Sequence, residues 1–208
     1  TLDASAASAA IFIDRLQVTA GALRLGGLAA VDQGALTQSG GTIAGSGMLS
    51  VVGGGFFGGG VQTGAGVTDV AGVSAVSGPI MLDGGHTLQN EQWLNWSAGN
   101  ITLGSGDAAA ATHTGTLAND LILYVTADNR LGGSGALNNN AGAVMAVFAG
   151  SGETDIDAVT NNAGHIQVQN GVLSLNGGGS SSGDGFFTAA GAVLQFGTPQ
   201  GAGSGGTF

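Results

Sequence analysis

The chain of 208 residues contains 43 glycines, no cysteine and only three basic residues, all arginine, and its net charge is −10. Without clustered Lys and Arg it cannot neutralise the phosphates of a nucleic acid or bind an anionic membrane surface. Without cysteine it has neither disulfides nor thiolate metal sites. Its mean hydropathy of +0.32 and apolar fraction of 43% exclude a disordered low-complexity chain, because such chains lack the apolar surface that offsets ordering.

The N-terminal segment is rich in Ala and small apolar residues. Residues 4–16, ASAASAAIFIDRL, fit a short helix and a strand about equally well. We therefore expect residues 1–20 to form either an N-terminal cap or a strand exchanged with another copy. No apolar run in the chain reaches the ~18 residues of a membrane helix, so we expect no direct insertion into a membrane.

From residue 20 onward, short alternating apolar runs stand between Gly, Asn and Ser, a pattern that predicts an all-β fold. The clearest of these runs span residues 22–25, 48–52, 79–83, 100–104, 121–125, 143–148, 165–169, 172–175 and 192–196. Two glycine-rich stretches, 53–60 and 177–187, read as longer loops projecting from corners of the fold. Residues 198–208 read as a Gly-rich tail.

Two arrangements of these strands compete at Asn170-Gly171. This dipeptide is either a hairpin turn in an antiparallel meander or a corner in a parallel solenoid. Residues 115–119 recur at 135–139, an offset of 20, and residues 139–142 recur at 161–164, an offset of 22. A meander needs no such period, whereas a solenoid stacks each side chain on its equivalent one strand spacing away.

The spacing therefore predicts one domain over residues 1–208, a single-stranded right-handed parallel β-helix (β-solenoid) with 20–22 residues per coil and about ten coils. Equivalent residues should form structural ladders along the rod. We expect Leu117 to stack on Leu137 in the interior. At a corner we expect Asn139 to stack on Asn161, where side-chain amides can hydrogen-bond along the stack.

The last ~105 residues carry a recurring phrase, seen in NNAGHIQVQNGVLSLNGGG at 161–179 and in GFFTAAGAVLQFG at 185–197. This phrase resembles the repeats of secreted bacterial β-helix proteins of the filamentous-haemagglutinin-like and autotransporter-passenger type. The resemblance extends loosely to residues 21–55 and poorly to 56–92. It implies an extracellular or cell-surface rod with a structural or adhesive role.

Glu153, Asp155 and Asp157 alternate along one strand and should share its outward face, while Ile156 points inward. Neighbouring carboxyls would then lie ~6.5–7 Å apart, within the range of inverting glycosidases. Sites for acidic polysaccharides also need basic residues, which are scarce here. We interpret these three residues as a solvated acidic face without a catalytic role. The alternative is that they form a weak calcium site.

The aromatic residues are the remaining candidates for contact with a ligand or partner. Trp93 and Trp96 should fall on opposite faces of a strand, one packed and the other exposed. The two Phe-Phe pairs should likewise place one ring inside and one outside. From these we take Trp93, Trp96, Phe57 and Phe187 as possible contacts.

The sequence thus predicts a non-catalytic structural or adhesive solenoid, secreted or on a bacterial surface, which forms filaments or matrix and needs no cofactor. The expected partners are itself, by head-to-tail or strand-exchange assembly, or cell-surface and matrix glycans. A carbohydrate-binding or carbohydrate-cleaving β-helix and the stalk of a secreted passenger protein stay open as alternatives.

Overall fold

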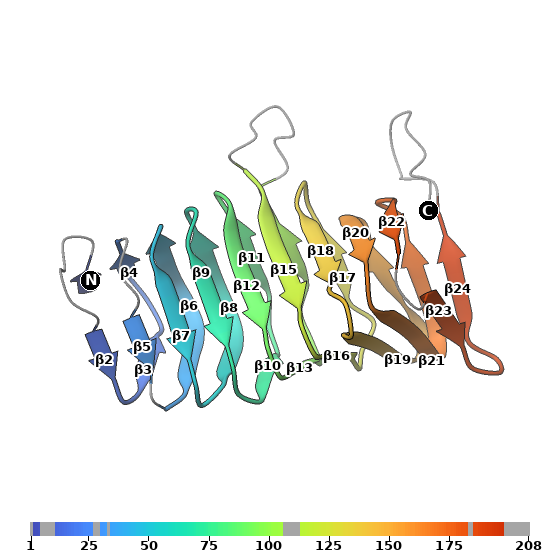
Figure 1. Cartoon of the computed structure of the whole chain (residues 1–208), viewed down its shortest axis with the longest axis horizontal. Helices are drawn as coiled ribbons and strands as arrows, with labels where there is room; N and C mark the ends of the chain where they lie inside the picture. Colours follow the sequence, from blue (N-terminus) through green and yellow to red (C-terminus); the bar gives the residue numbers. More distant parts are fainter. Residues whose placement is uncertain are drawn as a thin grey trace.

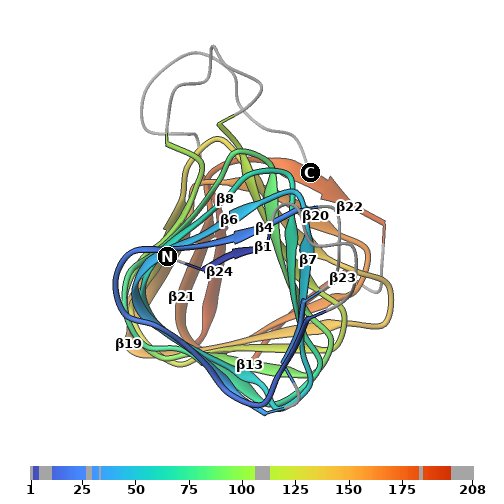
Figure 2. The same ribbon diagram turned by 90° about the vertical axis from the view of Figure 1, so that its left-hand side faces the viewer.

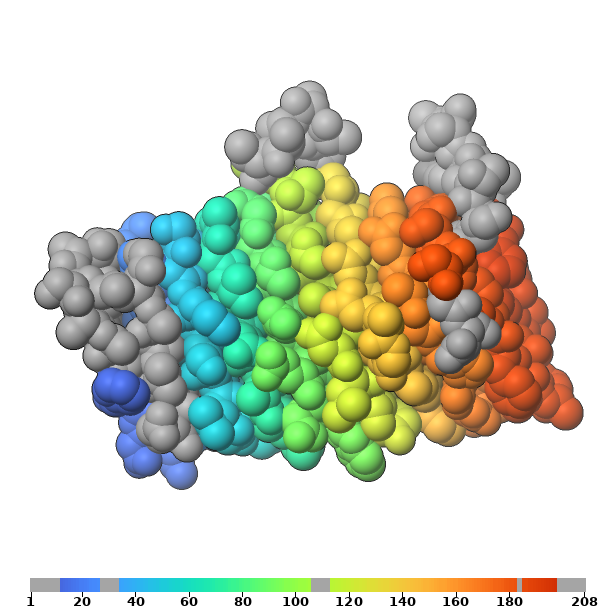
Figure 3. All heavy atoms as spheres, viewed as in Figure 1, coloured from blue at the N-terminus to red at the C-terminus, as the bar shows by residue number. Residues whose placement is uncertain are grey.

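The computed structural model describes residues 2–4, 11–26, 30–32, 34–105, 113–182 and 185–197, so the tail at 198–208 lies outside the described residues. These residues form a parallel β-solenoid without any helix. Its strands stack along the long axis from the N-terminal to the C-terminal end, and each coil occupies one slice of the rod (Figures 1 and 3). The fold class predicted from the spacing is confirmed.

The strands enclose a three-sided interior, which is visible along the rod axis in Figure 2. We name the three sides face A, face B and face C. Face A is the nine-stranded sheet of β2 (Ile11–Ile13), β5 (Ala30–Asp32), β7 (Met48–Val51), β9 (Val67–Val70), β12 (His86–Asn90), β15 (Gly115–Asn119), β18 (Ala136–Asn139), β20 (Val159–Asn162) and β22 (Gly179–Ser181).

Faces B and C belong to one 15-stranded sheet, because four long strands bend across the corner between them. These four are β6 (Leu36–Gly45), β8 (Gly55–Thr63), β19 (Val144–Ile156) and β21 (His165–Leu175). Face B contains their first halves together with β3 (Leu16–Val18), β10 (Ser74–Val76), β13 (Trp93–Trp96), β16 (Ile122–Val125) and β23 (Gly185–Thr188). Face C contains their second halves together with β1 (Leu2–Ala4), β4 (Ala22–Leu25), β11 (Ile80–Asp83), β14 (Ile101–Leu103), β17 (Arg130–Gly132) and β24 (Val193–Phe196).

The first strands pair in register with the second coil rather than forming a helix. Strand β2 pairs with β5, and β3 pairs with β6, both in the parallel sense. Within the described residues, this part of the predicted cap or exchanged segment is therefore the first coil of the solenoid.

Equivalent residues on face A are 19, 20, 23 or 29 positions apart, as the hydrogen-bonded pairs that join successive coils show. The rod has about eight turns, fewer than the ten predicted from length alone. The longest spacing, 29, separates Asn90 from Asn119 and includes residues 106–112, which lie outside the described residues. Extra residues between strands therefore lengthen a coil without adding one.

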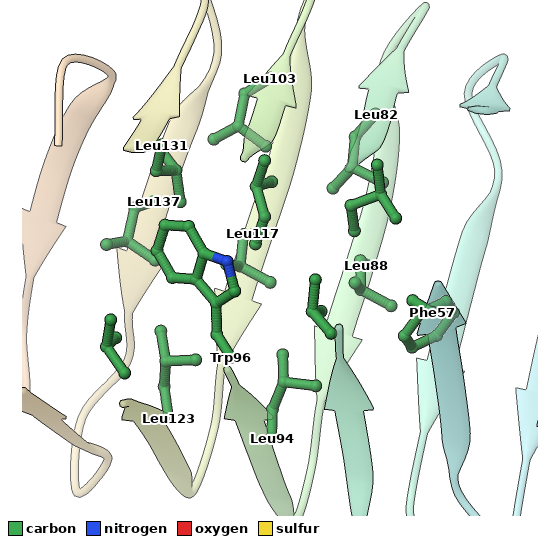
Figure 4. Packing of buried hydrophobic residues seen from close by; sticks show 14 of the residues in the cluster. Phe57, Leu82, Leu88, Leu94, Trp96, Leu103, Leu117, Leu123, Leu131 and Leu137 are labelled. Atoms are coloured by element: carbon green, nitrogen blue, oxygen red, sulfur yellow. The ribbon is translucent and has the colours of Figure 1, made fainter. Parts of the chain in front are cut away.

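The core is built from inward columns of aliphatic side chains. Leu117 stacks on Leu137, as the spacing predicted, and Leu88, in the preceding coil, stacks on Leu117. All three are completely buried, and Figure 4 shows leucines from successive strands pointing into the same interior beside Trp96. Burial of each leucine side chain stabilises the fold by about 1.5–3 kcal/mol relative to an exposed leucine. The columns of aliphatic side chains are therefore a main source of the stability of the rod.

A ladder of buried asparagines runs along the corner between faces A and B. Asn90 donates from Nδ2 to Oδ1 of Asn119, Asn119 donates to Asn139, and Asn139 donates to Asn162, each at 2.8 Å. Each amide also donates to a backbone carbonyl at the start of the face B strand in the next coil, for example that of Val144 on β19. The ladder closes the corner because it satisfies carbonyls that turn away from the sheet.

The predicted pairing of Asn139 with Asn161 is wrong by one residue. Asn161 lies opposite Asn138 on the outside of face A and donates to its Oδ1 at 3.0 Å. The corner that follows Asn139 takes four residues, 140–143, but the corner that follows Asn162 takes only 163–164. Matching the two Asn-Asn-Ala-Gly phrases therefore shifted the register.

The glycine-rich stretches are also not the projecting loops that the sequence predicted. Residues 55–60 belong to β8, and residues 179–181 and 185–187 belong to β22 and β23, while 183–184 lie outside the described residues. Asn170-Gly171 lies inside β21 and turns the chain from face B to face C, with a positive φ of 74° at Gly171. It is a solenoid corner, and no hairpin forms there.

Candidate binding surface

The three outer faces of the rod differ in chemistry although one repeat builds them all. Face A presents small and amide side chains, including the stacked Asn138, Asn161 and Ser180. Face C presents polar and acidic groups, including Arg130 beside Asp155 in the register of β17 and β19. Face B presents aromatic rings, and it lies along the lower edge of Figure 1 at β10, β13 and β16.

Three rings from successive coils form a continuous row on face B. Trp93 on β13 lies edge-to-face against Tyr124 on β16, with ring centroids 5.5 Å apart and an interplanar angle of 75°. Tyr124 in turn contacts Phe148 on β19, with centroids 5.9 Å apart at 44°. Trp93 is 47% exposed and Phe148 is 36% exposed, so solvent reaches the outer side of the row.

Other exposed apolar residues extend the row toward both ends of the rod. Phe56 on β8 is 49% exposed and Phe187 on β23 is 50% exposed, and Val73 and Leu121 are exposed at the edge of the face. The outward column through β8, β10, β13, β16, β19, β21 and β23 contains, in order, Phe56, Ala75, Asn95, Tyr124, Ala146, Gln167 and Phe187. An exposed apolar surface of this kind is typical of an interaction site.

Charge is missing from this surface within the part of the chain that the structure describes. From β6 to β23, no strand segment on face B contains Asp, Glu, Lys or Arg. The one histidine in these segments is His165. The acids lie elsewhere: Asp69 on face A, Glu91 and Asp120 at the corner between faces A and B, and Asp155 on face C. A partner of high charge finds no counter-charge on face B.

Two amide groups beside the rings have donors that no described protein group accepts. Asn95 accepts a hydrogen bond from Thr126 at its Oδ1, 3.1 Å away, and Gln167 accepts one from Gln169 at 3.0 Å. Their side-chain N–H groups have no partner among the described residues. Face B therefore combines apolar rings with a few free donors, the composition typical of recognition surfaces.

Two of the four predicted contact residues cannot reach a partner. Trp96 and Phe57 are completely buried, and Trp96 donates from Nε1 to the carbonyl of Gly99 at 2.7 Å. Trp93 and Phe187 are exposed as predicted, and in the first Phe-Phe pair the exposed ring is that of Phe56. The prediction that one ring is buried and the other exposed is confirmed for the two tryptophans and for this Phe-Phe pair.

Sequence reasoning missed Tyr124 and Phe148. Both stand at outward positions of apolar runs, between buried neighbours such as Leu123, Val125 and Val147. The alternation of buried and exposed residues within LILYV and AVMAVF would have placed both rings outside.

The acidic row lies on face C as predicted, with Thr154 and Ile156 buried between the carboxylates. Its members are held by neighbours on adjacent coils. Asp157 pairs with Arg130, Asn176 donates to Asp155 at 3.3 Å and to Asp157 at 2.9 Å, and Ser174 donates to Glu153. Burial, together with the charges of Glu153 and Asp157, raises the pKa of Asp155.

These contacts occupy one oxygen of Glu153, one of Asp155 and both of Asp157. Within the described ranges, no group of three or more His, Cys, Asp or Glu residues is placed to hold a metal ion. The arrangement of Glu153, Asp155 and Asp157 therefore gives no support to the hypothesis that they form a calcium site.

A second set of titratable groups lies on and beside face A. His86 is buried, and its Nε2 lies 3.0 Å from the hydroxyl of Thr68 on the neighbouring strand. Burial lowers the pKa of His86 to about 4. Burial also raises the pKa of Asp69, and the charge of Asp69 is the main cause that raises the pKa of Glu91. Because folding shifts the pKa of each of these groups, each one makes the stability of the fold depend on pH.

Comparison of the chain with protein-family models, curated proteins and solved structures gives no match. The described residues contain no helix that is long and apolar enough to span a membrane.

Proposed function

We propose that this chain is a non-catalytic structural and adhesive segment of an extracellular or bacterial cell-surface protein, with face B as its contact surface. The observation that carries the proposal is the contacting row of Trp93, Tyr124 and Phe148, with the exposed Phe56 and Phe187 on the same face, whose described strand segments from β6 to β23 contain no Asp, Glu, Lys or Arg. Exposed aromatic side chains of this size contribute strongly to association, because they bury large areas at little conformational cost.

The state of the acidic row supports a role without catalysis. Asp155 and Asp157 share the amide of Asn176, and Asp157 also pairs with Arg130, which are the contacts expected of a structural polar row that joins neighbouring coils. The repeat phrase supports the location, since it resembles surface proteins of the β-helix type.

One observation favours a second candidate, a carbohydrate-binding solenoid. The exposed ring of Trp93 stands on the same side of β13 as Asn95, whose amide N–H is free. A sugar ring can pack on such an indole while its hydroxyls accept from the amide.

An adhesion assay tests the proposal. Beads coated with the chain should attach to matrix-coated surfaces, and Phe56→Ser combined with Trp93→Ser should reduce attachment at least about fivefold, since hot-spot rings dominate such contacts. The matched control is Met48→Ser with Val159→Ser, which removes two exposed apolar side chains from face A instead. Equal attachment by both double variants would refute face B as the contact surface.

A second arm tests the absence of catalysis. Neutral and acidic polysaccharides incubated with the chain should yield no products, and Asp155→Asn with Asp157→Asn should leave attachment unchanged. Product release that this double variant abolishes would assign an active site to face C.

A further inference from the structure

The proposed function leaves open what covers face B, and the repeat of the face along the rod bears on this question. Its outward residues recur once per coil, and hydrogen-bonded strands lie ~4.8 Å apart. Trp93, Ile122, Val144 and His165 form one outward column, and Asn95, Tyr124, Ala146 and Gln167 form the next. Any partner that covers several coils must match this period.

We propose that face B packs against face B of a second copy of this chain, so that two solenoids associate side by side. The inference rests on the proposed function, because it names the partner of the same surface. It differs from head-to-tail assembly, since the contact is lateral and uses sheet faces rather than strand edges.

The first argument is the matching of periods. A second solenoid has the same spacing between coils, so a contact made at one coil recurs at the next along the whole face. Two sheets pack face to face at ~10 Å, with side chains from both surfaces interdigitating between them. The inclined rings of Trp93, Tyr124 and Phe148 stand out from the sheet at 75° and 44° to one another. They form ridges suited to interdigitation and not the coplanar platform that would favour a flat sugar chain.

The second argument is charge. Each copy has a net charge of −10, so two copies repel one another in most orientations. Contact through face C would bring Asp155 toward its equivalent, whereas Asp69, the one charged residue in the face A strands from β7 to β22, is buried, so charge separates face B from face C rather than from face A. Face B, uncharged from β6 to β23 in the described residues, lets two copies meet without placing like charges in the interface.

The third argument is the satisfaction of polar groups. The free N–H groups of Asn95 and Gln167 lie in the same outward column, one and two coils, respectively, from Tyr124 at the centre of the row. Amides on facing copies can donate and accept reciprocally, which pairs these donors without introducing charge.

Sedimentation of the whole chain, with isosteric charge variants, tests the proposal. The native chain should sediment as a dimer at tens of micromolar. Asn95→Asp with Gln167→Glu places like charges in the interface and should weaken dimerisation at least about tenfold at low salt, with partial recovery at high salt. Asn161→Asp adds one negative charge on face A and should leave the dimer intact, whereas Asn95→Asp alone, which adds the same single charge on face B, should weaken it. Because all three positions are on the outside of the rod, the fold tolerates these changes.

Single cysteines give an independent measurement, since the chain has no cysteine of its own. Asn95→Cys and Gln167→Cys, alone or mixed, should form disulfides between copies faster than Asn161→Cys. A native chain that stays monomeric, or cross-linking no faster on face B than on face A, would overturn the proposal.

Failure of the inference and failure of the proposed function can be told apart. If the native chain is monomeric but Asn95→Asp abolishes its binding to a neutral glycan or to another protein, face B remains a contact surface with a different occupant. If neither self-association nor adhesion depends on face B, both proposals are wrong.

Discussion

His86 provides a direct test of how the interior tolerates a titratable group. Its imidazole is buried on β12, with Nε2 3.0 Å from the hydroxyl of Thr68, and the pKa of His86 falls from 6.5 to about 4 because burial disfavours the charged form. The experiment therefore lowers the pH, and the matched variant is His86→Gln. Glutamine is close to histidine in size, can still hydrogen-bond to Thr68 and does not titrate.

The sign follows from linkage. The unfolded chain binds a proton at His86 near pH 6.5, but the folded chain does so only near pH 4, so stability falls as the pH drops through this window. The two pKa values differ by about 2.5, and at about 1.36 kcal/mol for each pH unit the loss approaches about 3 kcal/mol. Asp69, Glu91 and Asp155 act in the opposite direction, because their raised pKa values let protonation relieve the folded state at low pH.

Comparison with the variant removes this background. Denaturant unfolding of both proteins, followed by tryptophan fluorescence at pH 7, 6, 5 and 4, should show the native chain losing about 2 kcal/mol relative to His86→Gln by pH 5 and about 3 by pH 4. Parallel curves for the two proteins would refute the reasoning, since they would mean that His86 is protonated in the folded chain without cost.

Two further changes test the ladder and the corners. Asn119→Val, the residue found at the equivalent Val70, leaves Asn139 and the carbonyl of Val144 without their donor and should cost about 2 kcal/mol in urea unfolding. The same change at the exposed Asn161 should cost less than about 0.5 kcal/mol, and equal losses would contradict the ladder. Gly133→Ala and Gly142→Ala both force a side chain into positive φ, at about 1–2 kcal/mol each. A Cβ at Gly133 also meets the Leu103 carbonyl at 2.3 Å, whereas one at Gly142 meets nothing within 4 Å. Gly133→Ala should therefore lower the melting temperature clearly more than Gly142→Ala, and similar shifts would argue against close packing of the coils.

The fold could be predicted from sequence because a solenoid repeats its residue types along with its geometry. The recurrence of Leu117 at Leu137 was sufficient to find both period and register there. The predicted register was wrong at Asn161, which pairs with Asn138 instead of Asn139. Where a corner changes length between coils, the sequence does not show which of two adjacent asparagines points inward. The prediction that Phe57 contacts a partner was wrong for a related reason. Alternation along a strand places one ring of a Phe-Phe pair inside, but it does not say which one. That is decided by the neighbouring coil, where the buried Val76 lies opposite Phe57.

The aromatic row was harder to find because its members are far apart in sequence. Trp93, Tyr124 and Phe148 come from three coils of unequal length, so no single spacing links them. Only the stacking of β13, β16 and β19 brings them together.

The difference between the three faces is the strongest reason to assign function to face B. The backbone of each coil bonds to the coils before and after it, and the inward columns supply the apolar burial, so the outward residues are largely free of demands from the fold. Face A and face C use this freedom mainly for small, polar and charged groups, although Phe12 and Met48 on face A and Phe196 on face C are also exposed. Face B instead gathers rings on one surface: Trp93 and Phe148 both contact Tyr124, and the exposed Phe56 and Phe187 stand on the same face, although exposed rings risk aggregation. Contact with a partner explains why such rings stand there, and an uncharged face on an acidic chain indicates that this partner is itself apolar and uncharged at the contact, as a second copy of face B would be.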